Sequence, residues 1–278
     1  MTSKQISYNG NPNLKPIGTV ESYSAEQVKE LMRCMSDPIY FIENYCKIVS
    51  LDRGLIDFKL YECQKEKVDV ILNNRKVILM EGRQQGKTIT SAACILWYTL
   101  FQENKTVAIL ANKSSAAREV LSRYELMYEM LPMWMQQGVK TFNKGDIELE
   151  NGSKVFTAAT SSSGIRGKSV NWLYIDEAAI IPNNVAEDFF TSVYPTISAG
   201  NTTKILLTST PLGYNHFWKF WNEAEQGLNG FVPLFIPYSR IPGRDEKWAN
   251  EQKSMLGELK FNQEVLCRFL GSSNTLIN

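Results

Sequence analysis

The sequence predicts an α/β fold with a mostly parallel β-sheet and helices on both of its faces. Several apolar stretches have the length of a strand but no alternation of polar and apolar residues, which is typical of strands buried on both faces. Helical stretches separate them, and helical crossovers are the usual connections between parallel strands. The 278 residues, 44% of them hydrophobic, are enough for one large domain with a small satellite.

The N-terminal quarter of the chain is predicted to be an arm followed by helices. Residues 1–22, which are rich in Asn, Gly, Pro and Ser, favour an extended arm. A helix should begin after Ser24, because Gln27 three residues later completes a capping box. Helical patterns also extend over residues 37–49 and 60–74, and we expect two further helices there.

Apolar runs and turn signals place the remaining elements. The pair Asn151-Gly152 lies between two alternating runs and predicts a β-hairpin over residues 145–159. Buried strands are predicted within residues 77–80, 105–112, 171–175, 202–207 and 231–238. Helices are predicted within residues 114–131 and 214–227 and in the tail after Asp245.

The stretch KVILMEGRQQGKTITSAACILWYTL, residues 76–100, reads as a strand, a polar loop and a helix. Gly86, Lys87 and Thr88 form the end of a phosphate-binding pattern, but Glu81 stands where that pattern has its first glycine. Backbone N–H groups at the helix start would attract phosphates, Lys87 would reach the terminal ones, and Thr88 would bind Mg²⁺. A chance Gly-Lys-Thr at a strand–helix turn is the alternative.

Two more polar clusters follow predicted strands, at the edge where open parallel sheets bind their ligands. Asp176 and Glu177 end one strand; Asp176 can hold Mg²⁺, and Glu177 can orient the attacking water. Acids that merely cap a strand are the alternative, which the nearby phosphate loop disfavours. Thr208, Ser209 and Thr210 end another strand, and their hydroxyls could sense a γ-phosphate.

Several of these stretches together resemble one family. GRQQGKT, YIDEAAIIPN, TSTPLGYNHFWKFW, NKGDIELENGS and SGIRGKS are similar to segments of the large terminase subunits of tailed bacteriophages, especially T-even-like ones. The likeness also runs through NPNL and DPIYFIENYCKI and so covers almost the whole chain. The missing first glycine and the early arginine of the loop look like features of that family.

The resemblance implies a P-loop NTPase fold of the ASCE/RecA-like type and a motor ATPase that moves double-stranded DNA into a procapsid. It implies ATP and Mg²⁺ as cofactors, with Thr88 and Asp176 at the metal, Glu177 as the catalytic carboxylate and Thr208–Thr210 as the coupling motif. The implied ATP-binding residues are Gln64, Arg83, Gln84, Gln85, Gly86, Lys87 and Thr88.

Two functional details remain open at this stage. Gln64 matches an adenine-sensing glutamine, but Cys63 stands where the family usually has an aromatic residue, and Tyr61 lies two positions earlier. Two arginines are candidates for stabilising the transition state: Arg83 in the loop itself could act in cis, and Arg166 could reach a neighbouring subunit's nucleotide in trans.

The resemblance also implies partners and a location. These are double-stranded DNA, the portal protein, the small terminase subunit, and a pentameric ring of copies that are monomers in isolation, in the host cytoplasm and at the portal vertex. We expect an ATPase core over residues 23–235, a partial lid or linker over 236–278, and no nuclease domain or nuclease activity. Candidate DNA contacts are Lys140, Lys144, Arg118 and Arg123, although basic residues are often simply solvated.

Composition excludes some classes and leaves others open. A net charge of +1 gives no global sign of nucleic-acid binding. Five cysteines without a Cys-x-x-Cys pair argue against a zinc site and for a reduced, intracellular protein, and no stretch is long enough to span a membrane.

A helicase-like ATPase is the main alternative function, and a non-hydrolysing nucleotide switch is a weaker one. The single histidine, His216, is expected to pack beside aromatic residues without a chemical role.

Overall fold

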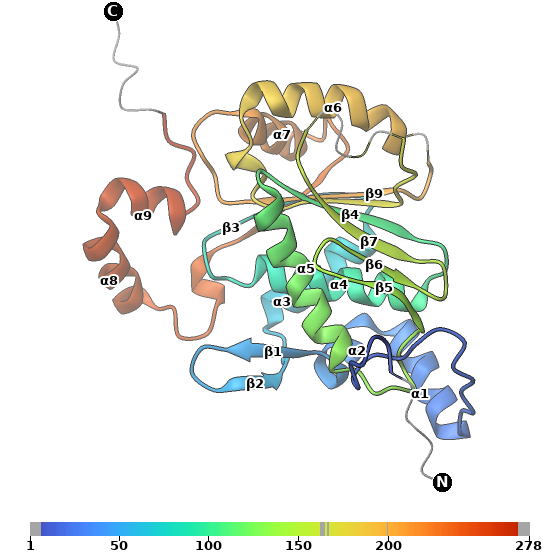
Figure 1. Ribbon diagram of the computed structural model, residues 1–278. Coiled ribbons are helices and arrows are strands. Elements are labelled where there is room, and N and C mark those ends of the chain that lie inside the picture. The colour runs from blue at the N-terminus through green and yellow to red at the C-terminus, as the bar shows by residue number, and fades with distance from the viewer. Residues whose placement is uncertain (1–6, 162–164, 166, 199, 272–278) are drawn as a thin grey trace, which may run out of the picture.

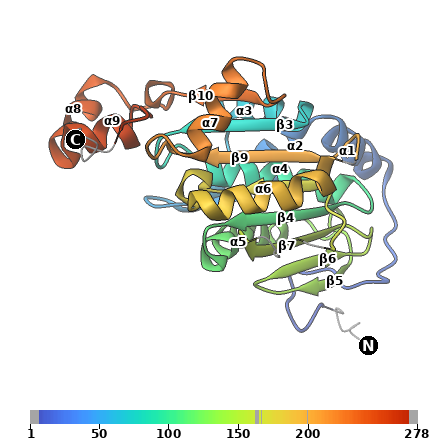
Figure 2. The same ribbon diagram turned by 90° about the horizontal axis from the view of Figure 1, so that it is seen from above.

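A computed structural model describes residues 7–161, 165, 167–198 and 200–271. Within them, the centre is an eight-stranded sheet with the order β10-β3-β9-β8-β4-β7-β6-β5 (Figures 1 and 2). Strands β10 to β7 run parallel, and β6 and β5 are antiparallel. The bounds are β3 Lys76–Glu81, β4 Thr106–Ala111, β5 Val139–Phe142, β6 Asp146–Leu149, β7 Lys154–Ala159, β8 Trp172–Ile175, β9 Lys204–Ser209 and β10 Val232–Ile236.

Helices cover both faces of this sheet, as predicted. In Figure 1, α3, α4 and α5 lie below the sheet, and α6 and α7 lie above it. The helix bounds are α1 Ala25–Ser36, α2 Pro38–Tyr45, α3 Glu62–Asn73, α4 Lys87–Phe101, α5 Ser114–Glu129, α6 Asn183–Ser198, α7 His216–Glu225, α8 Glu246–Leu256 and α9 Glu258–Glu264. Among the described residues, no helix has the length and apolar character needed to cross a membrane.

The sheet separates two apolar cores. Val77 and Leu79 of β3 face the core that holds α2 to α5, whereas Ile78 and Met80 face the core that holds α6 and α7. Strand β3 therefore buries both of its faces, which explains its unbroken apolar sequence. Strand β9 lies between β3 and β8, so the two strands that precede the phosphate loop and the acidic pair are second neighbours. The predicted α/β fold is confirmed.

One predicted helix is wrong in its second half. Helix α2 ends at Tyr45, and the chain then forms a hairpin of β1 (Lys47–Ser50) and β2 (Gly54–Asp57). Two β-branched residues, Ile48 and Val49, favour strand over helix at this point. Gly54, with a φ of +66°, supplies a backbone conformation that other residues rarely adopt as the chain returns.

Other local predictions agree with the structure. The capping box of α1 is present, with Gln27 N–H donating to Ser24 Oγ at 3.2 Å and Ser24 N–H donating to Gln27 Oε1 at 2.9 Å. The hairpin of β6 and β7 turns at residues 150–153, where Gly152 has a φ of +81°. Local sequence signals thus fixed these boundaries correctly.

The two ends of the described chain differ in how they are held. Residues 7–22 form no helix, and they lie along the body with Leu14 and Lys15 buried. Helices α8 and α9 stand beside the sheet and share a small core of Ala249, Phe261 and Val265 (Figure 1). This α8–α9 unit lies within residues 236–278, the range in which a partial lid or linker is expected.

Candidate functional site

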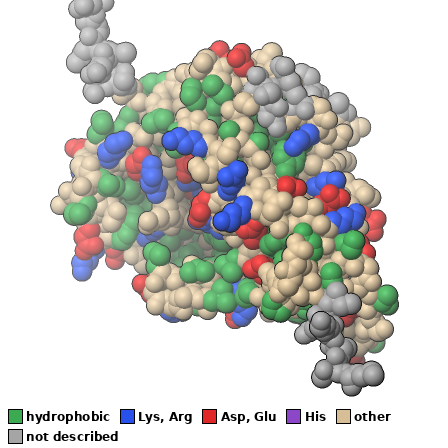
Figure 3. Space-filling model, in the orientation of Figure 1, with side chains coloured by type: hydrophobic (Ala, Val, Ile, Leu, Met, Phe, Trp, Pro, Cys, Tyr) green, Lys and Arg blue, Asp and Glu red, His purple; other side chains and the backbone are tan. Residues whose placement is uncertain are grey.

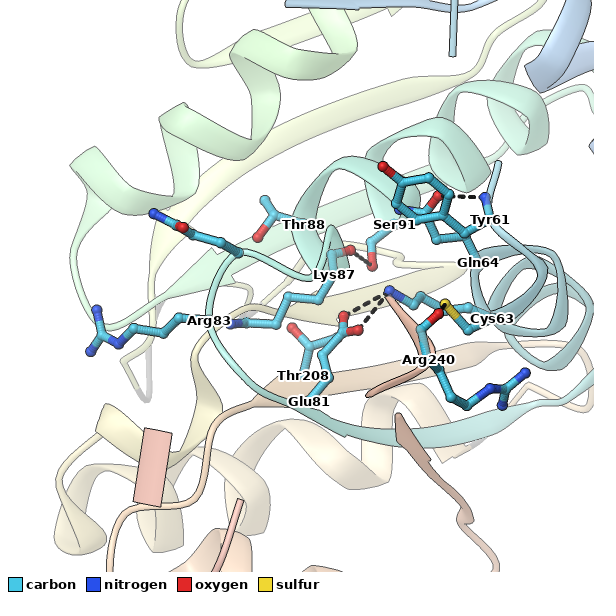
Figure 4. A network of polar contacts seen from close by, with 12 residues as sticks. Tyr61, Cys63, Gln64, Glu81, Arg83, Lys87, Thr88, Ser91, Thr208 and Arg240 are labelled. Atoms are coloured by element: carbon cyan, nitrogen blue, oxygen red, sulfur yellow. Dashed lines mark hydrogen bonds and ion pairs between the residues drawn. The ribbon is translucent and has the colours of Figure 1, made fainter. Parts of the chain in front are cut away.

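The phosphate loop connects β3 to α4. Gly86 is the N-cap of α4 with a φ of +85°, and a Cβ atom there would come within 2.5 Å of Gln64 Nε2. The left-handed backbone therefore favours glycine, and a Cβ atom would also displace the Gln64 amide. Lys87 begins the helix, and its side chain is only 7% exposed. The N-terminus of α4 and the Lys87 ammonium together concentrate positive charge at this point (Figure 4).

Asp176 brings the three predicted clusters together. It follows β8, and its carboxylate accepts hydrogen bonds from Thr88 Oγ1 at 3.1 Å and from Thr208 Oγ1 at 2.7 Å. Thr208 also lies 3.3 Å from the hydroxyl of Tyr174, which is completely buried. Burial and the nearby Asp176 charge raise the pKa of Tyr174 well above its ordinary value, so this hydroxyl stays neutral.

Glu177 lies across the phosphate loop from this hydroxyl cluster. Its Oε1 is 2.9 Å from Lys87 Nζ, while its Oε2 is buried and has no hydrogen-bond partner among the described residues. Its backbone is left-handed, with a φ of +52°. A carboxylate oxygen without a partner, beside a lysine at a helix N-terminus, is suited to accept a hydrogen bond from a water molecule.

The donor set also fits a hard divalent cation. Asp176 supplies a carboxylate and Thr88 a hydroxyl, which are the oxygen ligands that Mg²⁺ takes. Among the described residues no cluster of three or more acidic, histidine or cysteine side chains could hold a metal alone. In proteins, Mg²⁺ usually keeps several water ligands and binds one or two protein carboxylates together with substrate phosphates.

A cavity beside the loop is suited to a planar base. Tyr61, Gln64, Gly86, Pro242 and Arg244 line it. Gln64 is buried, and its Oε1 accepts the Tyr61 N–H at 3.0 Å, so its amide nitrogen is turned toward Gly86.

Tyr61, and not Cys63, belongs to the lining of this cavity. The Tyr61 side chain is exposed, whereas Cys63 is buried with its sulfur 3.6 Å from the Arg240 carbonyl. The position that is usually aromatic in the resembled family is therefore turned into the interior in this protein. The neighbouring tyrosine supplies an aromatic ring at the cavity instead.

Of the two candidate arginines, only Arg83 can be placed, because Arg166 lies outside the described residues. The Arg83 side chain is 66% exposed, and its Nε is 2.6 Å from Glu264 Oε2 of α9. Figure 4 shows its guanidinium pointing outward, away from Lys87. Arg244, which lies just before α8, donates hydrogen bonds to the backbone carbonyls of Arg83 at 3.3 Å and of Gln84 at 2.6 Å. The α8–α9 unit and the phosphate loop thus hold each other.

Sequence reasoning missed a buried ion pair beneath the loop. Lys67 of α3 and Glu81 of β3 are both completely buried, and Lys67 Nζ lies 2.8 Å from each carboxylate oxygen. Figure 4 shows these contacts beside Lys87. Burial raises the pKa of Glu81, and the positive charge of Lys67 is the main opposing effect. The residue in place of the first glycine is therefore half of an interior ion pair. Only the unusual Glu81 itself hinted at this.

The remaining loop residue, Gln85, is also buried. Its amide lies within 3.0 Å of the Ile236 carbonyl and 3.3 Å of the Gly82 N–H. Gln85 therefore links the loop to the end of β10. Gln84, by contrast, has a left-handed backbone with a φ of +56°.

Two of the four candidate DNA contacts pair with acidic side chains. Lys140 is 3.7 Å from Glu148, and Arg123 is 2.8 Å from Glu119. Arg123 also lines a cavity together with the phosphate loop and Glu177, so it lies closer to the nucleotide site than expected. On the face shown in Figure 3, basic and acidic side chains are intermixed.

Comparisons with known proteins identify the family of this chain. Residues 78–278 match the family model of the T4likevirus-type large terminase subunit, N-terminal. A large terminase subunit of Thermus virus P23-45 is 27% identical over 136 residues, which are 44% of this chain and 27% of that protein. The chain thus corresponds to a minor part of that relative's length.

Two solved structures share the fold. The large terminase ATPase domain of Thermus phage P74-26 has a TM-score of 0.60 and 19% identity, over 77% of this chain and 95% of that one. The large terminase of a thermophilic bacteriophage, solved in complex with ADP, has a TM-score of 0.61 and 13% identity, over 76% of this chain and 54% of that one. At these identities the likeness establishes the fold.

Proposed function

Because this chain belongs to the family of T4likevirus-type large terminase subunits, we propose that it hydrolyses MgATP to drive double-stranded DNA into a procapsid. The observation that carries the proposal is the meeting of Lys87, Asp176 and Glu177 at one sheet edge. Each has the chemistry, and the neighbours, that phosphoryl transfer to water requires.

The positions of these residues suggest separate roles in phosphate binding, metal binding and orientation of water. Lys87 and the start of α4 would bind the β- and γ-phosphates, and Thr88 and Asp176 would hold Mg²⁺, which neutralises charge that develops on the phosphates. Lys87 is now paired with Glu177. Phosphate oxygens would draw the ammonium away, and the Glu177 carboxylate would then be free to orient the attacking water.

The base and coupling roles follow from the neighbouring elements. Tyr61 would stack on adenine in the cavity that Gln64 also lines. The Gln64 amide lies beside Gly86, so a movement of Gln64 on binding of the base would be transmitted to the loop. Thr208 touches Asp176 directly, so the Thr208–Thr210 motif at the end of β9 is in place to respond to the nucleotide. A large terminase solved with ADP supports nucleotide binding at such a fold.

The proposed partners are those of a packaging motor. They are double-stranded DNA, the portal protein and the small terminase subunit, and the chain would act in a pentameric ring at the portal vertex in the host cytoplasm. The nucleotide cleft supports the motor role, while the DNA-contacting residues are not assigned. Domain limits of 23–235 for the ATPase core and 236–278 for the lid remain part of this proposal.

ATP turnover tests the function. We expect hydrolysis by the chain, and stimulation by duplex DNA together with the portal protein. Lys87→Ala should abolish turnover and weaken triphosphate binding, and Asp176→Asn should weaken Mg²⁺-dependent binding. Lys29→Ala, which removes an exposed lysine of α1 outside the site, is the matched control. Normal turnover in a folded Lys87→Ala variant would refute the assignment of the site, and strand unwinding without packaging would favour a helicase-like enzyme.

A further inference from the structure

The turn that follows Glu177 is held in an unusual backbone conformation. Glu177 has a φ of +52°, in the left-handed region that non-glycine residues rarely occupy. The next residues form a short 3-10 turn, η1 (Ala178–Ile180). Such strain persists only where the surroundings hold it. The contacts of η1 therefore decide whether the Glu177 carboxylate stays beside Lys87.

Three side chains, one from the last residue of β9 and two from the segment that follows, hold this turn. Ser209 Oγ accepts the Ala179 N–H at 3.0 Å, and Asn215 Nδ2 donates to the Ala179 carbonyl at 2.7 Å. His216 Nε2 lies 2.8 Å from the Ala178 carbonyl. A carbonyl oxygen can only accept, so this contact requires the hydrogen to be on Nε2.

The imidazole ring is itself oriented. Asn183 Oδ1, at the start of α6, accepts the His216 backbone N–H at 3.1 Å and also lies 3.0 Å from His216 Nδ1. Burial lowers the pKa of His216, and a neutral ring can donate to only one of the two oxygens that face it. The shorter contact, to the Ala178 carbonyl, assigns the hydrogen to Nε2. The His216 backbone begins α7, whose N-cap is Asn215. Two helices thus fix the ring that faces the Ala178 carbonyl, the first carbonyl after Glu177.

We propose that His216 is a positioning residue for ATP hydrolysis, which keeps Glu177 in its left-handed conformation by holding the Ala178 carbonyl. The inference rests on the proposed function, because it gives Glu177 the task of orienting water. The segment from Thr208 to His216 then contacts Asp176 and the turn that follows Glu177: Thr208 donates to Asp176, and His216 holds the Ala178 carbonyl. His216 thereby gains a role beyond packing beside aromatic residues.

Two substitutions separate this role from bulk packing. A glutamine at 216 places its amide nitrogen near the position of Nε2, whereas an asparagine reaches only as far as Nδ1. We expect His216→Gln to retain most of kcat. His216→Asn should lose kcat on the order of 10- to 100-fold, the scale expected when a catalytic group shifts by about 1 Å. The KM for MgATP should stay near that of the parent, because Lys87 and Thr88 remain in place.

The control is Lys219→Ala, an exposed position on the same helix, which should leave kcat and KM unchanged. Thermal denaturation of all variants is measured in parallel. The inference is overturned if His216→Asn keeps the parental kcat, or if its kcat, nucleotide affinity and thermal stability fall together and His216→Gln gives no rescue. The latter pattern would mean a structural role only.

A second measurement needs no activity. His216 is the only histidine in the 278 residues, so a histidine-selective ¹⁵N NMR spectrum of the whole chain contains one imidazole. We expect a hydrogen on Nε2 at neutral pH. A ring protonated on Nδ1 alone would overturn the inference even if every activity experiment failed. An inactive parent with an Nε2 hydrogen would instead refute the proposed hydrolysis and leave the contact intact. If His216→Asn does not fold, the NMR result decides.

Discussion

At the scale of single residues, Asp176 is the most constrained group of the site. Thr88 comes from the helix after the phosphate loop and Thr208 from the strand between β3 and β8, and both donate to the same carboxylate. A movement of either element would therefore change a hydrogen bond to the Asp176 carboxylate. This shared acceptor is a physical route by which binding at the loop can reach β9, and it needs no long chain of contacts.

Glu177→Gln should separate nucleotide binding from chemistry. The amide keeps the size of the side chain but cannot polarise water as a carboxylate does, so we expect kcat to fall about 10²-fold or more. MgATP affinity should stay near the parental value or improve slightly, because Lys87 loses a competing anion. Single-turnover kinetics and equilibrium nucleotide binding measure the two effects.

Collapse of affinity together with turnover would contradict the water-orienting role. Glu177 would then be a metal ligand or a structural residue. Glu103→Gln is a suitable control, because it removes an exposed carboxylate beyond the end of α4 that lies opposite Lys87.

The sequence predicted some of these residues and could not predict others. Lys87, Asp176 and Thr208 each lie at or just beyond the carboxyl end of a buried parallel strand. Such strand ends meet at one edge of the sheet, so the convergence of these residues was predictable. The contact of His216 with the Ala178 carbonyl depends on how α7 packs against η1. That packing is a tertiary event, and no local pattern near His216 encodes it.

At the scale of elements, the pair Lys67–Glu81 joins α3 to β3 directly below the phosphate loop. Lys67 lies one helical turn after Gln64, on the same face of α3. The pair therefore fixes the helix that carries Gln64 against the strand that carries the loop. A buried pair is weak evidence of net stability, but removal of one partner leaves an uncompensated charge in the interior.

Lys67→Met should destabilise the protein by about 3–5 kcal/mol at neutral pH, the usual cost of breaking a buried pair. The double variant Lys67→Met/Glu81→Leu should recover most of this loss, because no buried charge remains. Urea unfolding of the parent and both variants measures these free energies. Equal instability of the single and double variants would show that shape, rather than charge, holds α3 to β3.

The pH dependence of Lys67→Met has a predictable sign. Burial already raises the pKa of Glu81 above its ordinary value of 4.5, and loss of Lys67 removes the main opposing charge. A carboxyl whose folded pKa exceeds its unfolded pKa stabilises the protein below the unfolded value, and this stability is lost as pH rises through the folded pKa. The defect should therefore be small near pH 4.5 and grow toward neutral pH. A defect that is constant across this range would contradict the explanation.

The β1–β2 hairpin shows where element prediction failed. Its strands have four residues each and are partly or fully exposed, so neither the two-residue period nor a continuous apolar run is visible. The preceding helix ended without a glycine or proline signal. The hairpin nevertheless borders the cavity assigned to the base, through residues such as Ile48 and Leu55. One wall of the cavity proposed to hold the base was therefore not predictable from the sequence.

At the scale of the whole molecule, the phosphate loop and the α8–α9 unit are tied in both directions. Arg83 of the loop forms an ion pair with Glu264 of α9, and Arg244 donates hydrogen bonds to two carbonyl groups of the loop. Burial lowers the pKa of Arg244, which is the ordinary cost of a cation in a partly enclosed position. In this arrangement the Arg83 guanidinium is paired with Glu264 and points away from Lys87. Stabilisation of the transition state would require Arg83 to leave Glu264, or a different arginine.

The two arginines can be distinguished by mixing chains at the portal ring. We propose that Arg166 acts in trans and that Arg83 helps to position the phosphates. Activity per chain should then rise with concentration or with portal binding. A Glu177→Gln chain has a dead site but an intact Arg166, and an Arg166→Ala chain has an intact site. Mixing them should restore activity, because an arginine supplied in trans is worth roughly 10³–10⁵ in rate. A Glu177→Gln/Arg166→Ala chain, which has no arginine to lend, should restore none. If rings form but the first mixture stays inactive, and activity per chain is flat with concentration, then Arg83 must release Glu264 and act in cis.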